Sequence, residues 1–274
     1  MKKSKRILFL LLAIGVGIFD QAFQIFNYGY LKKYLDRICS DQSFAGVVGS
    51  SIELIIFASI FYFVFYRRGS ELRNFDRDYK RLKLKNYQIF LIALGLSGTT
   101  EVWLYIAENY LSFIPAIKNS LDLFNKAMNY NQGESSFILA LIYGTVLAAL
   151  MEEFLFRGII HNSIKLSFRS RLLAILLTGI VFGIWHGILV QAIYAALGGI
   201  FFSYIYERTG KISVTIAIHF ISNFISSIAP ELDKILPGTE NFYELVTLFS
   251  IPFLFYYLRD KKWFYKLKIK LITF

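Results

Sequence analysis

The sequence predicts an all-α protein, a polytopic bundle of about eight transmembrane helices with both termini in the cytoplasm. Of its 274 residues, 56% are hydrophobic, and the mean hydropathy is +0.51. The apolar residues come in long runs such as 52–66 and 172–190, whereas a soluble domain intersperses them with charges. About 20 apolar residues cross the bilayer core, so seven or eight such runs indicate a membrane protein.

The apolar runs place the expected helices in order along the chain. The first run follows the basic stretch MKKSKR, and no small-residue cleavage site comes after it, so we expect an uncleaved helix rather than a signal peptide. The sixth and seventh are short for a full crossing, and almost no polar turn separates the fifth from the sixth. The expected spans are 7–31, 44–66, 87–113, 136–163, 172–190, 191–206, 212–228 and 242–258.

The charges between the runs alternate and so predict the orientation. Five stretches carry net positive charge: +4 before the first run, +5 in 67–86, +3 in 164–171, +1 in 207–211 and +5 from 259 onward. Two stretches between them are not basic: the net charge is zero in 114–135 and −2 in 229–241. Cytoplasmic loops are enriched in Lys and Arg, so this alternation places both termini in the cytoplasm.

Charge and cysteine content exclude two classes of function. The formal net charge is +11, which in a soluble protein would suggest nucleic acid. Here the charges lie beside apolar runs, so we expect an anionic membrane surface as the partner and no nucleic acid. Cys39 is the only cysteine, which excludes an internal disulfide and a CxxC metal site.

Several charged residues fall inside the apolar runs. A charge at bilayer depth costs about 2.5–3.5 kcal/mol on insertion scales, so each needs a partner or a wet cavity. Glu53, Glu101 and Glu108 stand alone in the sequence and are interpreted as structural. His161, at the cytoplasmic end of the fourth helix, is expected to cap carbonyls or to favour the helix dipole.

The fourth helix carries a cluster of charges that is harder to explain. Glu153 and Arg157 are four residues apart and can pair on one helix face. Glu152 is rotated by about 100° from Glu153, so it points elsewhere and has no local partner. A carboxylate without a partner at membrane depth suggests a function.

Two later helices supply polar side chains at the same helical spacing. Phe182 and His186 are four residues apart in the fifth helix, and His219 and Asn223 are four residues apart in the seventh. Peptide hydrolysis needs a base, a held water and donors for the developing oxyanion. One glutamate, two histidines and an asparagine at similar depth could provide these functions.

These three segments resemble a known family. EEFLFRG at 152–158, FGIWH at 182–186 and HFISN at 219–223 match the EExxxR, FxxxH and HxxxN/D motifs of the CAAX-protease and bacteriocin-processing (CPBP, or Abi) family of intramembrane endopeptidases. Each motif alone is weak, but three in order on predicted membrane helices are a strong combination. The resemblance covers about 148–223. We therefore divide the chain into N-terminal helices of unknown role (1–130), a catalytic core (131–230), and a last helix with a basic tail (231–274).

The resemblance implies a role for each motif residue. Glu152 would activate water, His186 would help to bind that water, and His219 and Asn223 would stabilise the oxyanion. No cofactor is expected. One glutamate and two histidines could bind zinc or another divalent ion, so a metal on Glu152, His186 and His219 is kept as an alternative. The spacing is not HExxH, so no single helix would supply both histidines. The residues expected to support the site are Glu153, Arg157 and Phe182.

The expected function is an intramembrane endopeptidase of the bacterial plasma membrane that cuts a membrane-associated peptide or protein. The first alternative is a scaffold without proteolytic activity that regulates another membrane protein, or a bacteriocin self-immunity protein. A transporter ranks last, because no inverted repeat or matching pair of broken helices is visible.

Overall fold

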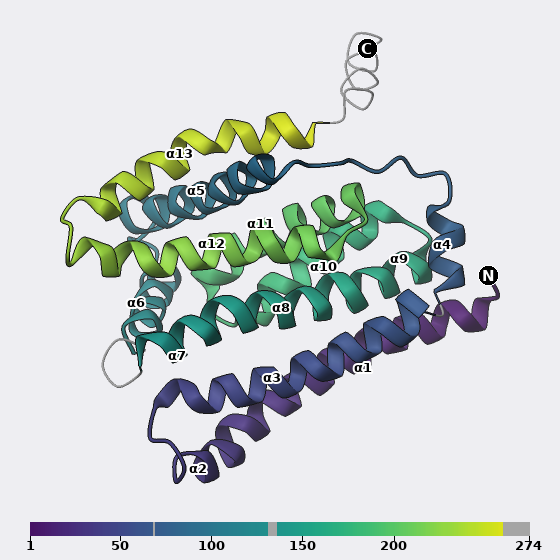
Figure 1. The fold of residues 1–274 in the computed structure, drawn as a ribbon, viewed down its shortest axis with the longest axis horizontal. Coiled ribbons are helices and arrows are strands. Elements are labelled where there is room, and N and C mark those ends of the chain that lie inside the picture. The colour runs from purple at the N-terminus through teal and green to yellow at the C-terminus, as the bar shows by residue number, and fades with distance from the viewer. Residues whose placement is uncertain (68, 131–135, 260–274) are drawn as a thin grey trace.

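The computed structural model describes residues 1–67, 69–130 and 136–259, and within these ranges the chain forms helices and no strand. The all-α prediction is therefore confirmed. The expected basic tail lies almost wholly outside the described residues. In chain order the helices in Figure 1 are α1 (Lys3–Phe26), α2 (Lys32–Leu35), α3 (Gln42–Ile60), α4 (Ser70–Asp76), α5 (Asn86–Tyr110), α6 (Pro115–Tyr130), α7 (Phe137–Leu141), α8 (Ala148–Glu152), α9 (Asn162–Phe168), α10 (Arg171–Trp185), α11 (Leu189–Thr209), α12 (Ile212–Asp233) and α13 (Thr239–Leu258).

Short π-helical segments join several of these helices into longer rods. Segments Asn27–Leu31 and Phe61–Arg67 extend the first two rods, and two further segments, Ile142–Leu147 and Glu153–His161, connect α7, α8 and α9. Six helical stretches within the described residues are long and apolar enough to cross a membrane, while α10 is shorter. The protein is thus an integral membrane protein; the count of eight crossings and the side of the termini stay predictions. The six stretches are Lys3–Leu35, Ser43–Arg67, Asn86–Tyr110, Phe137–Phe168, Leu189–Thr209 and Ile212–Asp233.

The helices form three groups across the molecule. Figure 1 shows α5 and α13 side by side along one edge and α1 with α3 along the opposite edge. The rod from α7 to α9 lies between them with α10, α11 and α12. The segments that carry the three motifs therefore occupy the centre of the bundle.

Glycines allow the closest helix pairs to approach each other. A Cβ atom on Gly183 of α10 would lie 2.4 Å from the Ala192 carbonyl oxygen of α11, and one on Gly98 of α5 would lie 2.3 Å from the Thr247 carbonyl oxygen of α13. Neither position has room for a side chain. Small residues at such crossings are typical of membrane helices, where close packing replaces the hydrophobic driving force.

The boundary between the fifth and sixth expected helices differs from the prediction. The helix expected over 172–190 ends at Trp185, and α11 begins at Leu189. Gly187 lies between them at φ +74°, a left-handed conformation that ends the helix. His186 therefore caps α10 instead of lying within it.

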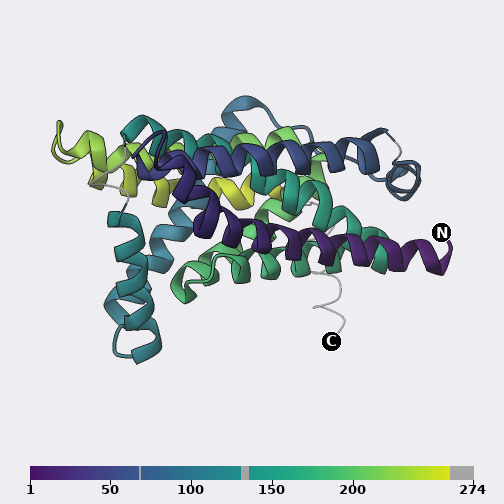
Figure 2. The ribbon, with the colours of Figure 1, turned by 90° about the horizontal axis from the view of Figure 1, so that it is seen from below.

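Two segments treated as loops contain helices. The stretch 114–135 includes α6, which projects from the side of the bundle (Figure 2). The stretch 67–86 includes α4, whose last residue, Asp76, belongs to a buried polar network. Helix α4 is thus attached to the bundle.

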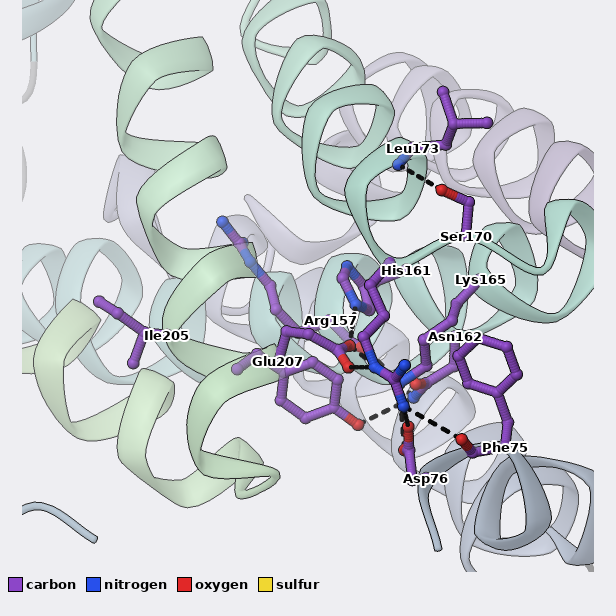
Figure 3. A network of polar contacts seen from close by, with 12 residues as sticks. Phe75, Asp76, Arg157, His161, Asn162, Lys165, Ser170, Leu173, Ile205 and Glu207 are labelled. Atoms are coloured by element: carbon purple, nitrogen blue, oxygen red, sulfur yellow. Dashed lines mark hydrogen bonds and ion pairs between the residues drawn. The ribbon is translucent and has the colours of Figure 1, made fainter. Parts of the chain in front are cut away.

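This network joins four helices at one end of the bundle (Figure 3). Glu207 of α11 is 1% exposed and accepts hydrogen bonds from Lys165 Nζ at 2.9 Å and Arg171 Nε at 2.8 Å. Asp76 of α4 lies 3.2 Å from Lys165 and 2.7 Å from Arg81. Opposite charges thus compensate one another where single charges would be costly.

The network corrects two expectations. Lys165 was counted among the loop charges of 164–171, yet α9 runs to Phe168 and Lys165 is 1% exposed. His161 was expected to cap carbonyls or favour the dipole, but its Nε2 lies 3.0 Å from Glu207 Oε2. Lys165 and His161 are therefore both paired with Glu207, which lies on another helix.

Candidate active site

The central rod places the two motif carboxylates at a change of helix geometry. Glu152 is the last residue of α8, and Glu153 begins the π-helical segment that runs to His161. Glu152 is 7% exposed and Glu153 is fully buried. π-helical turns inside α-helices occur often at functional sites, because they redirect side chains without ending the helix.

Glu153 and Arg157 form the ion pair expected from their spacing. Arg157 Nη1 lies 2.9 Å from Glu153 Oε1, and both side chains are fully buried. The contact is an ion pair without the alignment of a hydrogen bond, since Nη1 has no hydrogen-bond partner among the described residues. The guanidinium also lies over the rings of Phe182 and Phe202, 4.6 and 4.9 Å from their centroids. Arg157 is therefore held by charge on one side and by aromatic faces on the other.

His219 of α12 lies between the two carboxylates. Its Nδ1 is 3.0 Å from Glu153 Oε1, and its Nε2 is 3.8 Å from Glu152 Oε2. Because a carboxylate accepts, Nδ1 carries the hydrogen and Nε2 faces Glu152. Glu152 Oε2 is buried and has no hydrogen-bond partner among the described residues. A 3.8 Å separation of polar atoms is too long for a direct hydrogen bond and is of the kind that a water bridges.

His186 is held by its own helix end. Its Nδ1 lies 2.8 Å from the Phe182 carbonyl oxygen, so Nδ1 donates and Nε2 keeps its lone pair. The imidazole lies edge to face against Phe182 and Trp185, with centroids 4.7 and 5.1 Å away. The side chain is therefore oriented on one side and half-exposed on the other.

Asn223 follows His219 by one turn of α12. Its Nδ2 donates to the Gly144 carbonyl oxygen at 3.1 Å, which fixes the orientation of the amide. One amide hydrogen is used in this way and the second is left to donate.

Three of the four predicted catalytic residues share one cavity. A cavity of about 170 Å³ is lined by His186, His219 and Asn223 together with Phe182. Glu152 does not line it and lies behind His219, at the 3.8 Å contact described above. The fold thus brings the three motifs together, with the carboxylate one layer behind the cavity wall.

The residues named for a metal do not form a ligand set in this geometry. Within residues 1–67, 69–130 and 136–259, no group of three His, Cys, Asp or Glu side chains is placed to hold a metal ion. The Nδ1 atoms of His186 and His219 are engaged by Phe182 and Glu153, which leaves only their Nε2 atoms for a ligand.

The structure also places an acid pair beside the site that the sequence analysis missed. Asp20 of α1 is fully buried, and Trp185 Nε1 donates to its Oδ2. The buried carboxyl of Glu53 in α3 lies beside it, which corrects the view that Glu53 stands alone. Trp185 directly precedes His186, so this pair supports the cavity wall from behind. The sequence feature that could have indicated this pair is Asp20, an acidic residue within the first apolar run.

The fold and the cluster define the class: a polytopic helical membrane protein with two histidines and an asparagine around a central cavity and a buried glutamate behind its wall. Comparison with protein families finds a match for residues 134–225 to the family described as "Type II CAAX prenyl endopeptidase Rce1-like". All three motifs fall inside this range, and the match confirms the family resemblance for the segment. Searches of curated proteins and of solved structures gave no match.

Proposed function

We propose that this protein is an intramembrane endopeptidase that hydrolyses a peptide bond in a membrane-associated peptide or protein, using a water activated by Glu152. The observation that carries the proposal is the contact of His219 with both motif carboxylates beside a cavity that His186 and Asn223 also line. The family match to an endopeptidase supports the same reaction class.

In the proposed reaction, Glu152 is the general base and His186 helps to bind the attacking water. A water that reaches Glu152 from the cavity would give one proton to the carboxylate, while His186 Nε2 accepts a hydrogen bond from its other O–H. Its oxygen would attack the carbonyl carbon of the substrate, and the carbonyl would become an oxyanion. Glu152 then returns the proton to the leaving nitrogen as the C–N bond breaks.

The oxyanion needs donors that are fixed before the reaction. Asn223 offers its second amide hydrogen, because Gly144 already holds the first. His219 donates from Nε2 when its ring carries a second proton, and Glu153 holds the opposite nitrogen in place. Arg157 balances the charge of Glu153 and keeps it ionised as an acceptor.

The setting that we propose is the bacterial plasma membrane, with a substrate that itself contacts the bilayer. A substrate of this kind suits a cavity that lies among helices long and apolar enough to cross a membrane. We also propose that nucleic acid is not a partner of this protein.

Glu152→Gln tests the proposal, since it keeps the side-chain shape and removes the base. The purified full chain in nanodiscs should lose about 10²–10⁴-fold of its turnover of membrane-associated peptides. Glu108→Gln, on the exposed part of α5, is the matched control and should keep wild-type turnover. Unchanged turnover in both Glu152→Gln and His186→Ala would exclude this mechanism. A cellular phenotype rescued fully by Glu152→Gln would instead favour a scaffold.

We further propose that the reaction needs no resident metal. Dialysis against a chelator should leave turnover within about twofold of the starting value. Loss of turnover that Zn²⁺ restores would instead establish the alternative, with Glu152, His186 and His219 as ligands.

A further inference from the structure

The cavity extends beyond the four motif residues. Its wall continues along α12 from Asn223 to Ser226 and includes Glu101 of α5 and Tyr243 of α13. Glu101 was interpreted from sequence as structural, yet its side chain faces the same cavity as His186 and His219. The proposed mechanism gives it no role.

Glu101 lacks a compensating charge. Among the described residues it makes no ion pair, and the charges that act on it most strongly are the carboxyls of Glu244 and Glu240. An uncompensated carboxylate at membrane depth costs about 2.5–3.5 kcal/mol on insertion scales. A cation brought into the cavity would therefore find an unpaired acid in a negative field.

Tyr243 supplies a second, independent indication of a ligand. Its side chain is 9% exposed, and its hydroxyl is buried without a well-formed hydrogen bond to any described residue. The Ser97 hydroxyl lies close to it in the cavity wall but donates its own hydrogen to the Ala93 carbonyl oxygen, so the tyrosine oxygen receives no hydrogen bond from it. Buried hydroxyls are nearly always hydrogen-bonded, so this orphan is explained by a group that binds in the cavity.

Helix contacts give the separation between Glu101 and the reaction centre. The Ser222 hydroxyl donates to the Ala93 carbonyl oxygen, so these two positions lie at the same level. Glu101 is eight residues past Ala93 and Asn223 is one past Ser222, a difference of seven residues or about 10 Å along the helices. An extended peptide covers that distance in about three residues.

We propose that Glu101 and Tyr243 form a subsite for a basic side chain, lysine or arginine, about three residues from the scissile bond of the substrate. The ammonium or guanidinium pairs with Glu101 and donates a further hydrogen bond to the Tyr243 hydroxyl. The substrate class is therefore a membrane-associated peptide with a basic residue near the cleavage site. This inference rests on the proposed peptidase function.

Binding to the full chain in nanodiscs tests the subsite separately from catalysis. The probes are two fluorescent amphipathic peptide libraries that are identical except for a fixed lysine or a fixed glutamine at one position. Wild-type protein and Glu152→Gln should both bind the lysine library at least about tenfold more tightly. Glu101→Gln should bind the lysine and glutamine libraries with nearly equal affinity. Glu101→Lys should instead prefer a matching library with a fixed glutamate. Glu108→Gln is the control and should keep the wild-type preference for lysine.

The outcomes separate the two proposals. Equal binding of both libraries by wild-type protein, or no binding of either, overturns the basic subsite. A preference for lysine that persists in Glu101→Gln also overturns it. Lysine preference in a protein whose turnover is unaffected by Glu152→Gln would support the subsite while excluding the proposed catalytic mechanism.

Discussion

At the residue scale, Glu153, Arg157 and Asp20 are each paired with a residue distant in sequence or with one on their own helix. Glu153 is compensated by Arg157 and by the Nδ1–H of His219. Asp20 accepts hydrogen bonds from Trp185, Gln21 and Gln24. Glu152 and Glu101 differ from these because no described residue satisfies them fully. Incomplete compensation within a membrane therefore marks the groups that we assign to the reaction and to substrate binding.

The Glu153–Arg157 pair allows a stability test. Arg157→Met removes the cation and leaves a fully buried carboxylate, which should lower the free energy of unfolding by about 3–5 kcal/mol. The double variant Glu153→Gln, Arg157→Met should recover part of this loss, because no uncompensated charge remains. Unfolding in mixed micelles followed by circular dichroism measures both values. If the single variant were as stable as the wild type, the pair would have no structural role.

At the element scale, the sequence predicted what depends on local spacing and missed what depends on helix contacts. The i, i+4 pairs Glu153–Arg157 and His219–Asn223 were visible, because a helix brings such positions to one face. The end of α10 was misplaced, because Gly187 alone interrupts an otherwise apolar run. Asp20 and Glu207 were missed as network centres, since their partners are 165 and up to 126 residues away in the chain. These pairings appear only when the helices pack.

The α10–α11 contact should control both stability and activity. A methyl group on Gly183 would meet the Ala192 carbonyl oxygen at 2.4 Å, so Gly183→Ala should force the helices apart and move His186, which caps α10. We expect a loss of about 1–3 kcal/mol in unfolding free energy and lower turnover. Thermal unfolding and peptide turnover measure these effects.

The matched control is Gly17→Ala on α1, where a Cβ atom would have no neighbour within 4 Å. Alanine is favoured over glycine in helices, so this variant should be as stable as the wild type or slightly more so. Equal effects of the two substitutions would show that α10 and α11 are not in close contact at Gly183.

At the scale of the whole molecule, four of the five basic stretches meet at one end of the bundle. Arg6 donates to the Ser167 carbonyl oxygen, and Lys5 pairs with Glu71 at 3.0 Å. The Glu207 network adds the segment 207–211 to the same end. These stretches therefore lie at the same end of the bundle, and the positive-inside tendency predicts that this end faces the cytoplasm.

Cys39 provides a test of this orientation, because it is the only cysteine and lies beyond the far end of the first helical rod. The rod Lys3–Leu35 has 33 residues, or about 50 Å of helix, which exceeds the roughly 30 Å hydrocarbon core. Cys39 should therefore lie outside the cell, where a membrane-impermeant maleimide labels it in intact cells. Ser70→Cys in a Cys39→Ser background reports on the basic end at α4 and should be labelled only after permeabilisation. The reverse pattern would invert the orientation, and labelling of both positions in intact cells would show that the first rod does not cross the membrane.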